Sequence, residues 1–211
     1  MSGPVFLLVH GWGFAPDFWD AMRHHMPGTE CFCADLGFRG TTPCLPDLPP
    51  GRPVIAAGHS LGFLWLLHHR PLHWAGLIAI NGFPRFTKAP DWPGGMAARP
   101  LERMISRLDD DPRTVTADFL HRCGTDLPAD CALSLPELRN GLTALRDWDE
   151  RCHDSSVTLA LAGSTDPLVA LSLSNSAFPR LQIHPGGHLL PLEDPVWCAE
   201  HCLSVMKELN Q

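Results

Sequence analysis

Unbroken apolar runs alternate along this chain with stretches whose apolar residues recur at helical spacing. The run at residues 5–9 has no polar position, which is typical of a strand buried on both faces of a parallel sheet. Five more segments have a strand-like pattern, at 31–36, 54–58, 76–80, 157–162 and 181–184. Helical patterns fall between them, at 15–26, 61–70, 168–177 and 196–209. This order predicts an α/β fold, with a parallel sheet and helices on both faces.

Two stretches depart from this alternation. Residues 37–53 are rich in Pro and Gly and have no helical period, so this crossover is expected to be a loop. Residues 82–155 hold helical patterns, with starts expected at Arg99-Pro100 and Asp111-Pro112 and a third helix over 135–148. We therefore expect a core of residues 1–81 and 156–211, with residues 82–155 inserted as a helical cap.

The composition narrows the class of protein. The 211 residues suit one domain with an insertion, and a net charge of -7 argues against nucleic-acid binding over the whole surface. No apolar run is long enough for a membrane span, and the N-terminus lacks the pattern of a signal peptide. We therefore expect a cytoplasmic protein with its eight cysteines reduced. Cys31 and Cys33 alternate as in a strand, so no metal site is predicted.

The segment Gly58-His59-Ser60-Leu61-Gly62 fits the pattern G-x-S-x-G. It follows a predicted strand and precedes a helical pattern, which is the context of a strained strand-to-helix turn that exposes a nucleophilic serine. Ser60 is the candidate nucleophile. Attack by its hydroxyl on a carbonyl would build negative charge on the carbonyl oxygen, and two main-chain N–H groups can stabilise that charge. The expected donors are Leu61, directly after the serine, and Trp12, in the loop after the first strand.

A serine nucleophile needs a base and an acid that orients the base. His188 follows the last predicted strand and Asp166 follows the fifth, so both belong at the carboxyl ends of strands, where α/β sheets place their sites. Asp149 and Asp154 are rival acids, but both precede the fifth strand and would lie at its other end. The sequence therefore predicts a triad of Ser60, His188 and Asp166.

Taken together, the segments and their order resemble the α/β-hydrolase superfamily over nearly the whole chain. Four short segments are similar to the pimeloyl-(acyl-carrier protein) methyl ester esterases of biotin synthesis: His10-Gly11-Trp12-Gly13, Asp91-Trp92-Pro93-Gly94, Arg113-Thr114-Val115 with Phe119-Leu120, and Asn140-Gly141-Leu142. The resemblance implies an α/β-hydrolase fold with a shortened, mostly parallel sheet of about six strands. The usual first two strands and the helix before the nucleophile strand are expected to be missing.

This resemblance also implies a function. A Ser-His-Asp triad would cleave the methyl ester of a pimeloyl chain carried by acyl carrier protein, through an acyl-enzyme and without metal or organic cofactor. Alternatives are a related hydrolase that acts on another small ester or carbonyl substrate, and a binding protein on the same fold. We expect a monomer.

Two features of the expected cap bear on such a substrate. Phe119 and Leu120 are expected to line an acyl tunnel above the nucleophile, or else only to pack the cap on the core. Arg99, Arg103 and Arg107 are spaced four apart and would form one stripe on the first cap helix, suited to docking of an acidic carrier protein. The acids at 109–111 follow this stripe directly and could neutralise its end.

Overall fold

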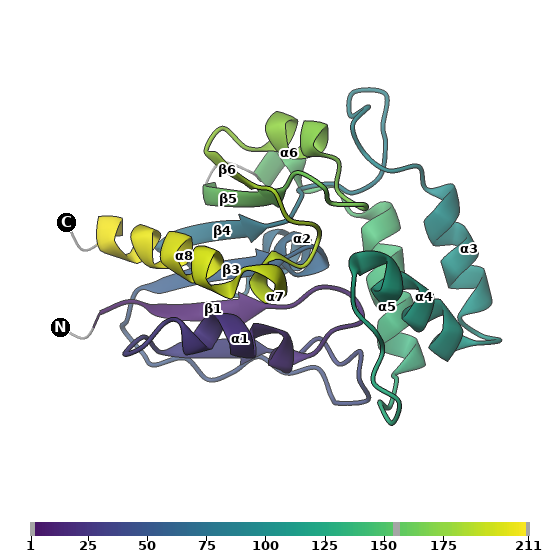
Figure 1. Ribbon diagram of the computed structural model, residues 1–211, viewed down its shortest axis with the longest axis horizontal. Coiled ribbons are helices and arrows are strands. Elements are labelled where there is room, and N and C mark those ends of the chain that lie inside the picture. The colour runs from purple at the N-terminus through teal and green to yellow at the C-terminus, as the bar shows by residue number, and fades with distance from the viewer. Residues whose placement is uncertain (1–2, 154–156, 210–211) are drawn as a thin grey trace.

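The computed structural model describes residues 3–153 and 157–209, and its centre is a six-stranded parallel sheet (Figure 1). The strands lie in the order β2-β1-β3-β4-β5-β6, with every neighbouring pair parallel. Their bounds are β1 Val5–Val9, β2 Cys31–Ala34, β3 Val54–His59, β4 Gly76–Ile80, β5 Val157–Gly163 and β6 Leu181–His184. The predicted α/β sheet is confirmed, and it is parallel throughout the described residues.

The helices cover both faces of this sheet. On one face α1 (Asp20–His24) and α8 (Pro195–Leu209) pack together, and on the other α2 (Leu61–His69) packs on β3 (Figure 1). Two more helices belong to the core, α6 (Leu171–Ala177) beside β5 and α7 (Leu190–Glu193) against α8. Because both faces are covered, every residue of β1 is fully buried, as its unbroken apolar run predicts.

Three predicted elements differ from the structure by more than one residue. The helix expected at 15–26 is divided into a 3-10 turn, η1 (Pro16–Trp19), and α1. The strand expected at 31–36 ends at Ala34, because the next two residues bond elsewhere: Asp35 pairs with Cys44, and the Leu36 N–H donates to the His10 ring. The helix expected at 168–177 begins at 171, because Asp166 accepts the N–H groups of residues 168 and 169.

The crossover between β2 and β3 is a loop. All of residues 37–53 are described, and they contain no helix, as the Pro-rich sequence predicts. No helix in the described part of the chain is both long and apolar enough to span a bilayer.

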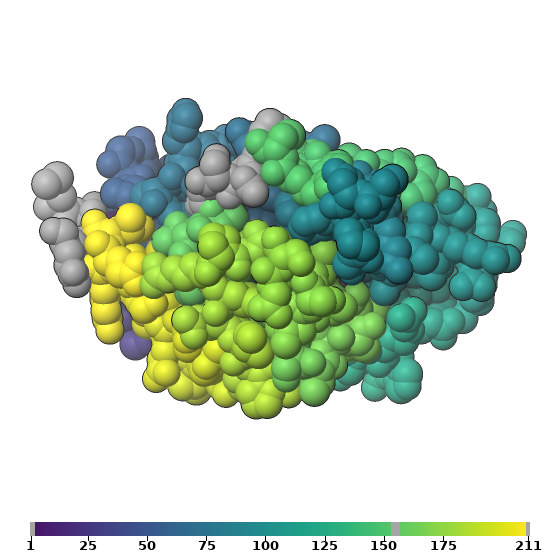
Figure 2. All heavy atoms as spheres, turned by 90° about the horizontal axis from the view of Figure 1, so that it is seen from above, coloured from purple at the N-terminus to yellow at the C-terminus, as the bar shows by residue number. Residues whose placement is uncertain are grey.

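Three helices lie between β4 and β5, at one end of the molecule (Figures 1 and 2). They are α3 (Arg99–Arg107), α4 (Pro112–Cys123) and α5 (Leu135–Asp147), followed by a 3-10 turn, η2 (Arg151–His153). Helix α4 begins where the Asp111-Pro112 pair predicts. Pro112 is its first residue, and the carboxylate of Asp111 accepts a hydrogen bond from the Thr114 N–H. The expected boundary between the cap and the second part of the core, at residues 155 and 156, lies outside the described residues.

Candidate active site

Ser60 lies in a strained turn between β3 and α2. Its φ of 52° and ψ of -120° are outside the usual regions for a residue with a side chain. Such a backbone costs about 1–3 kcal/mol and persists only where its surroundings enforce it. The surroundings do so here, because a Cβ on Gly58 would lie 2.4 Å from the Phe63 nitrogen, and one on Gly62 2.1 Å from the Val9 oxygen. Both glycines are therefore required for β3, the turn and α2 to meet.

The loop after β1 passes directly beside this turn. A Cβ on Gly11 would lie 3.3 Å from the Ser60 Cβ, so main-chain atoms of the loop reach the serine. Trp12 follows in this loop, and its buried indole N–H donates to the Leu138 oxygen in α5, at 2.8 Å. Leu61 is the first residue of α2, where a backbone N–H has no acceptor within the helix. Both expected N–H donors thus belong to segments that adjoin Ser60.

Asp166 and His188 are joined by a buried hydrogen bond. The His188 Nδ1 lies 2.7 Å from the Asp166 Oδ2, and both side chains are almost fully inaccessible. The other carboxylate oxygen accepts the N–H groups of Leu168 and Val169, at 2.7 and 2.9 Å. Burial acts to raise the pKa of Asp166, but the charge of His188 and the hydrogen bonds from His188, Val169 and Leu168 together hold this pKa below its ordinary value. The acid is therefore ionised and rigid, as a residue that orients a histidine must be.

Of the two rival acids the structure describes only Asp149, which is paired with arginines and not with His188. It forms ion pairs with Arg85 and Arg151. Asp154 lies outside the described residues.

Sequence reasoning missed a second histidine, His59. Its Nε2 lies 2.8 Å from the main-chain oxygen of His188, and a carbonyl can only accept, so this nitrogen carries the proton. The ring is fully buried and stacks on Phe18 at 4.5 Å. Burial lowers the pKa of His59 to about 3, so the ring is neutral. The only signal in the sequence is its place directly before the candidate nucleophile.

Asn81 was missed in the same way. It directly follows β4, has a φ of 47°, and is buried. Its side-chain nitrogen donates to Asp166 at 2.7 Å and to the Gly187 oxygen at 3.2 Å. Asn81 therefore ties the acid to the loop that carries His188. Its place at the carboxyl end of a strand was a usable signal, because the predicted acid and base occupy equivalent places.

The two predicted tunnel residues lie in α4, against the loop after β1. The rings of Phe119 and Trp12 meet edge to face, with their centres 4.9 Å apart. Leu120 is fully buried, and a Cβ on Gly13 would lie 3.5 Å from it.

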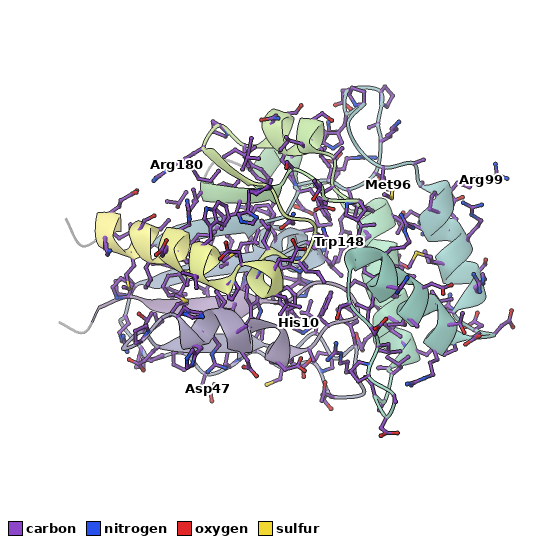
Figure 3. All side chains as sticks on the ribbon, in the orientation of Figure 1. His10, Asp47, Met96, Arg99, Trp148 and Arg180 are labelled. Atoms are coloured by element: carbon purple, nitrogen blue, oxygen red, sulfur yellow. The ribbon has the colours of Figure 1, made fainter. Side chains whose placement is uncertain are left out.

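A cavity of about 650 Å³ lies between the crossover loop, α2 and α5. Leu61 lines this cavity, whereas Ser60, Phe119 and Leu120 are not among its lining residues. Trp148, which directly follows α5 and is labelled in Figure 3, lines the same cavity.

The three arginines of the predicted stripe lie on α3 and are exposed. Arg99, at the start of the helix, points outward at the end of the molecule (Figure 3). Of the three acids that follow, Asp109 pairs with Arg139, and Asp111 caps α4. The hydrogen bond to Thr114 and the charge of Arg107 lower the pKa of Asp111, so this acid also lies within electrostatic reach of the stripe. In the described residues no Arg of the stripe forms an ion pair.

The described residues contain no cluster of three His, Cys, Asp or Glu side chains that could hold a metal ion. All eight cysteines are free thiols, and Cys31 and Cys33 lie in strand β2 as their alternation predicts. Burial raises the pKa of each of these two thiols to about 11.

Relatives of known name are similar over most of this chain, although no protein-family model matches it. The pimeloyl-(acyl-carrier protein) methyl ester esterase of Aromatoleum aromaticum is 28% identical, with 94% of this chain and 86% of the relative covered. The protein of the same name in Legionella pneumophila is 28% identical, with 79% and 77% covered. The similarity to these esterases that the four short segments predicted is therefore present over most of the chain.

Solved structures are similar over nearly the whole chain. An esterase from Exiguobacterium antarcticum has a TM-score of 0.78 at 18% identity, with 98% of this chain and 92% of that chain covered. A bromoperoxidase from Bacillus anthracis has a TM-score of 0.77 at 17% identity, with the same coverage. Identities this low establish the fold and leave the reaction open. The chain therefore has the α/β-hydrolase fold, and the relatives that its sequence resembles are pimeloyl-(acyl-carrier protein) methyl ester esterases.

Proposed function

We propose that this protein is a serine carboxylesterase that uses Ser60, His188 and Asp166. The observation that carries the proposal is the buried hydrogen bond between Asp166 and His188, at the same edge of the sheet as the strained turn of Ser60. An ionised acid on one ring nitrogen leaves the other nitrogen of His188 free to accept a proton. Similarity to esterases in sequence gives independent support.

In the proposed reaction, His188 takes the hydroxyl proton of Ser60 as the serine oxygen attacks the ester carbonyl. The main-chain N–H groups of Trp12 and Leu61 stabilise the oxyanion, each contributing about 3 kcal/mol. The tetrahedral intermediate collapses, the bond to the alcohol oxygen breaks, and the alcohol leaves with the proton from His188. Water then attacks the acyl-enzyme by the same route, which releases the acid and restores Ser60. Every proton and electron pair is supplied by the protein, the ester and water.

The proposed substrate is the methyl ester of a pimeloyl chain carried by acyl carrier protein. The names of the relatives support this substrate. The carrier would dock on Arg99, Arg103 and Arg107, because an acidic partner needs a locally positive surface on a chain of net charge -7. That these arginines form no ion pairs in the described residues supports the docking site.

A fluorophosphonate probe tests the chemistry directly, since it reacts only with an activated serine. The wild-type protein should be labelled at one residue, Ser60, and should lose esterase activity in proportion to labelling. Ser60→Ala should remain folded and unlabelled, with kcat lowered by about 10⁶. A folded wild-type protein that resists the probe would favour a binding protein on this fold.

The substrate is tested by complementation. A bacterial strain that lacks its own pimeloyl ester esterase needs biotin, and expression of this chain should remove that need, whereas Ser60→Ala should not. Active enzyme that fails to rescue growth would indicate another ester.

A further inference from the structure

The loop after β1 contacts the core on one side and the cap on the other (Figure 1). On the core side its main chain adjoins the nucleophile turn, since a Cβ on Gly11 would lie 3.3 Å from the Ser60 Cβ. On the cap side the Trp12 indole N–H donates to the main-chain oxygen of Leu138 in α5, at 2.8 Å. The residue that is expected to supply an oxyanion N–H from its main chain is therefore bound to the cap through its side chain.

Gly141 allows α5 to come this close. It lies three residues after Leu138, in the segment Asn140-Gly141-Leu142, which no step of the proposed reaction uses. A Cβ on Gly141 would lie 2.5 Å from Cδ1 of Trp12 and 2.9 Å from Cε1 of Phe38. A Cβ atom does not approach another heavy atom to 2.5 Å, so any other residue here would push α5 or the indole aside.

The Trp12 ring has no space into which it could retreat. Only 1% of its surface is exposed, and Phe119 packs on it edge to face, with ring centres 4.9 Å apart. Phe38 borders the cavity of about 650 Å³ and has room to shift, but Trp12 is not among the residues that line it. In a close-packed interior an added methyl group displaces its neighbour. The strain of a side chain at Gly141 would therefore fall on the indole.

Helix stability does not explain this glycine. Gly141 is the seventh of the thirteen residues of α5, and glycine inside a helix is less favourable than alanine because its backbone loses more freedom on folding. The close approach to Trp12 does explain it. Cδ1 is bonded directly to the donating nitrogen of the indole, so displacement of this atom would also break the hydrogen bond to Leu138.

We propose that Gly141 positions the oxyanion loop. It lets α5 fix the Trp12 side chain, and thereby the direction in which the Trp12 main-chain N–H points. Gly141 is a positioning residue, since it acts through Trp12. The inference rests on the proposed esterase reaction. It gives the cap a part in the chemical step, in addition to any contact with the substrate.

Gly141→Ala tests the inference, and Gly94→Ala is the matched control. Gly94 also belongs to the cap, but a Cβ there would lie 3.5 Å from Leu173, which is an ordinary contact. Loss of one oxyanion donor lowers kcat by about 10²–10³, so a misdirected donor should lower kcat for p-nitrophenyl acetate about tenfold or more, with KM nearly unchanged. This loss is expected in Gly141→Ala, whereas Gly94→Ala should match the wild type.

A thionoester with the same acyl and leaving groups separates this role from a merely structural one. Its sulfur accepts N–H hydrogen bonds more weakly than oxygen does, so the ratio of kcat/KM for the oxygen ester to that for the thionoester reports the oxyanion contact. This ratio should fall several-fold in Gly141→Ala and stay constant in Gly94→Ala. In a Trp12→Ala background the indole is absent, so Gly141→Ala should have little additional effect on kcat.

The Trp12 indole N–H signal in a ¹⁵N NMR spectrum tests the contact without hydrolysis. It is assigned by its absence in Trp12→Ala. In Gly141→Ala this signal should shift, and its proton should exchange with solvent several-fold faster because the hydrogen bond to Leu138 is lost. In Gly94→Ala both properties should be unchanged.

Three results would overturn the inference: an unchanged indole signal in Gly141→Ala, an unchanged ratio of oxygen ester to thionoester, or a loss of kcat in Gly141→Ala that persists in the Trp12→Ala background. The third result would mean that Gly141 serves the packing of the cap alone. The indole signal does not depend on ester hydrolysis, so loss of the contact and absence of esterase activity are scored separately.

Discussion

The imidazole Nε2 of His59 lies 2.8 Å from the main-chain oxygen of His188, and both residues are buried. The residue directly before the candidate nucleophile therefore holds the backbone of the candidate base. Because the His59 ring also stacks on Phe18, two independent contacts determine its orientation. The hydrogen bond joins the end of β3, directly before Ser60, to the loop that carries His188.

Removal of this donor should impair the chemical step more than substrate binding. In His59→Phe the ring packing is kept, but the buried His188 oxygen loses its donor, which costs about 1–3 kcal/mol. We expect kcat to fall about tenfold with KM nearly unchanged. His59→Gln supplies an N–H at a similar reach and should recover part of the loss. Equal kcat values for the Phe and Gln variants would mean that His59 serves packing alone.

Stability should fall as the pH falls below about 6.5, the ordinary pKa of histidine. Burial lowers the pKa of His59 to about 3 in the folded state, so between these values the unfolded chain binds a proton that the folded protein does not. The free energy of unfolding then falls by up to about 1.4 kcal/mol for each unit that the pH is lowered. Urea unfolding of the wild type and His59→Phe at pH 7, 6 and 5 measures this slope. The slope should be smaller in the variant, and an unchanged slope would contradict the prediction.

Asp166→Asn should nearly abolish ester hydrolysis, with kcat lowered by roughly 10⁴ as in comparable triads. The amide oxygen can still accept the N–H groups of Leu168 and Val169, so the turn should remain folded. Asp149→Asn is the control. It breaks ion pairs with Arg85 and Arg151, so it should lower stability while kcat stays within a few-fold. The opposite ranking of the two kcat values would assign the acid to Asp149.

Phe119→Leu should weaken the hydrolysis of long acyl esters more than that of acetate esters. Leucine preserves most of the apolar volume but loses the edge-to-face contact with Trp12, which contributes about 0.5–1.5 kcal/mol. The KM for p-nitrophenyl octanoate should rise several-fold, and the KM for p-nitrophenyl acetate should stay nearly constant. A parallel change in both would mean that Phe119 only packs the cap on the core.

Reversal of two charges on α3 should separate carrier docking from chemistry. Arg103→Glu with Arg107→Glu should lower kcat/KM for carrier-bound substrate, and the loss should shrink as salt screens the interaction. Both side chains are exposed, so the fold should tolerate the change. Hydrolysis of p-nitrophenyl acetate serves as the control and should be unaffected. Equal losses for both substrates would indicate a structural role for these arginines.

Several features of the fold were readable from the sequence because they depend on local patterns. The unbroken apolar run of β1 indicates burial on both faces, and β4 and β6 have the predicted bounds. The glycines on either side of Ser60 indicate the tight turn that the structure contains. Where the predicted bounds of an element were wrong, a hydrogen bond to a polar side chain or to a distant segment had taken the backbone groups that the local pattern assigned to that element. The helix at 171–177 starts late because the Asp166 carboxylate takes the N–H groups of the first predicted turn.

By itself, the sequence determined which residues form strands, which turn can present a serine, and that Asp166 and His188 each follow a strand. Only the tertiary structure decided that Asp166 lies 2.7 Å from His188, that His59 and Asn81 support this pair, and that Gly141 brings α5 against the Trp12 ring. The physical reason is that periodicity reports burial within one element. Hydrogen bonds between side chains many residues apart depend instead on strand order and on the way the cap helices pack.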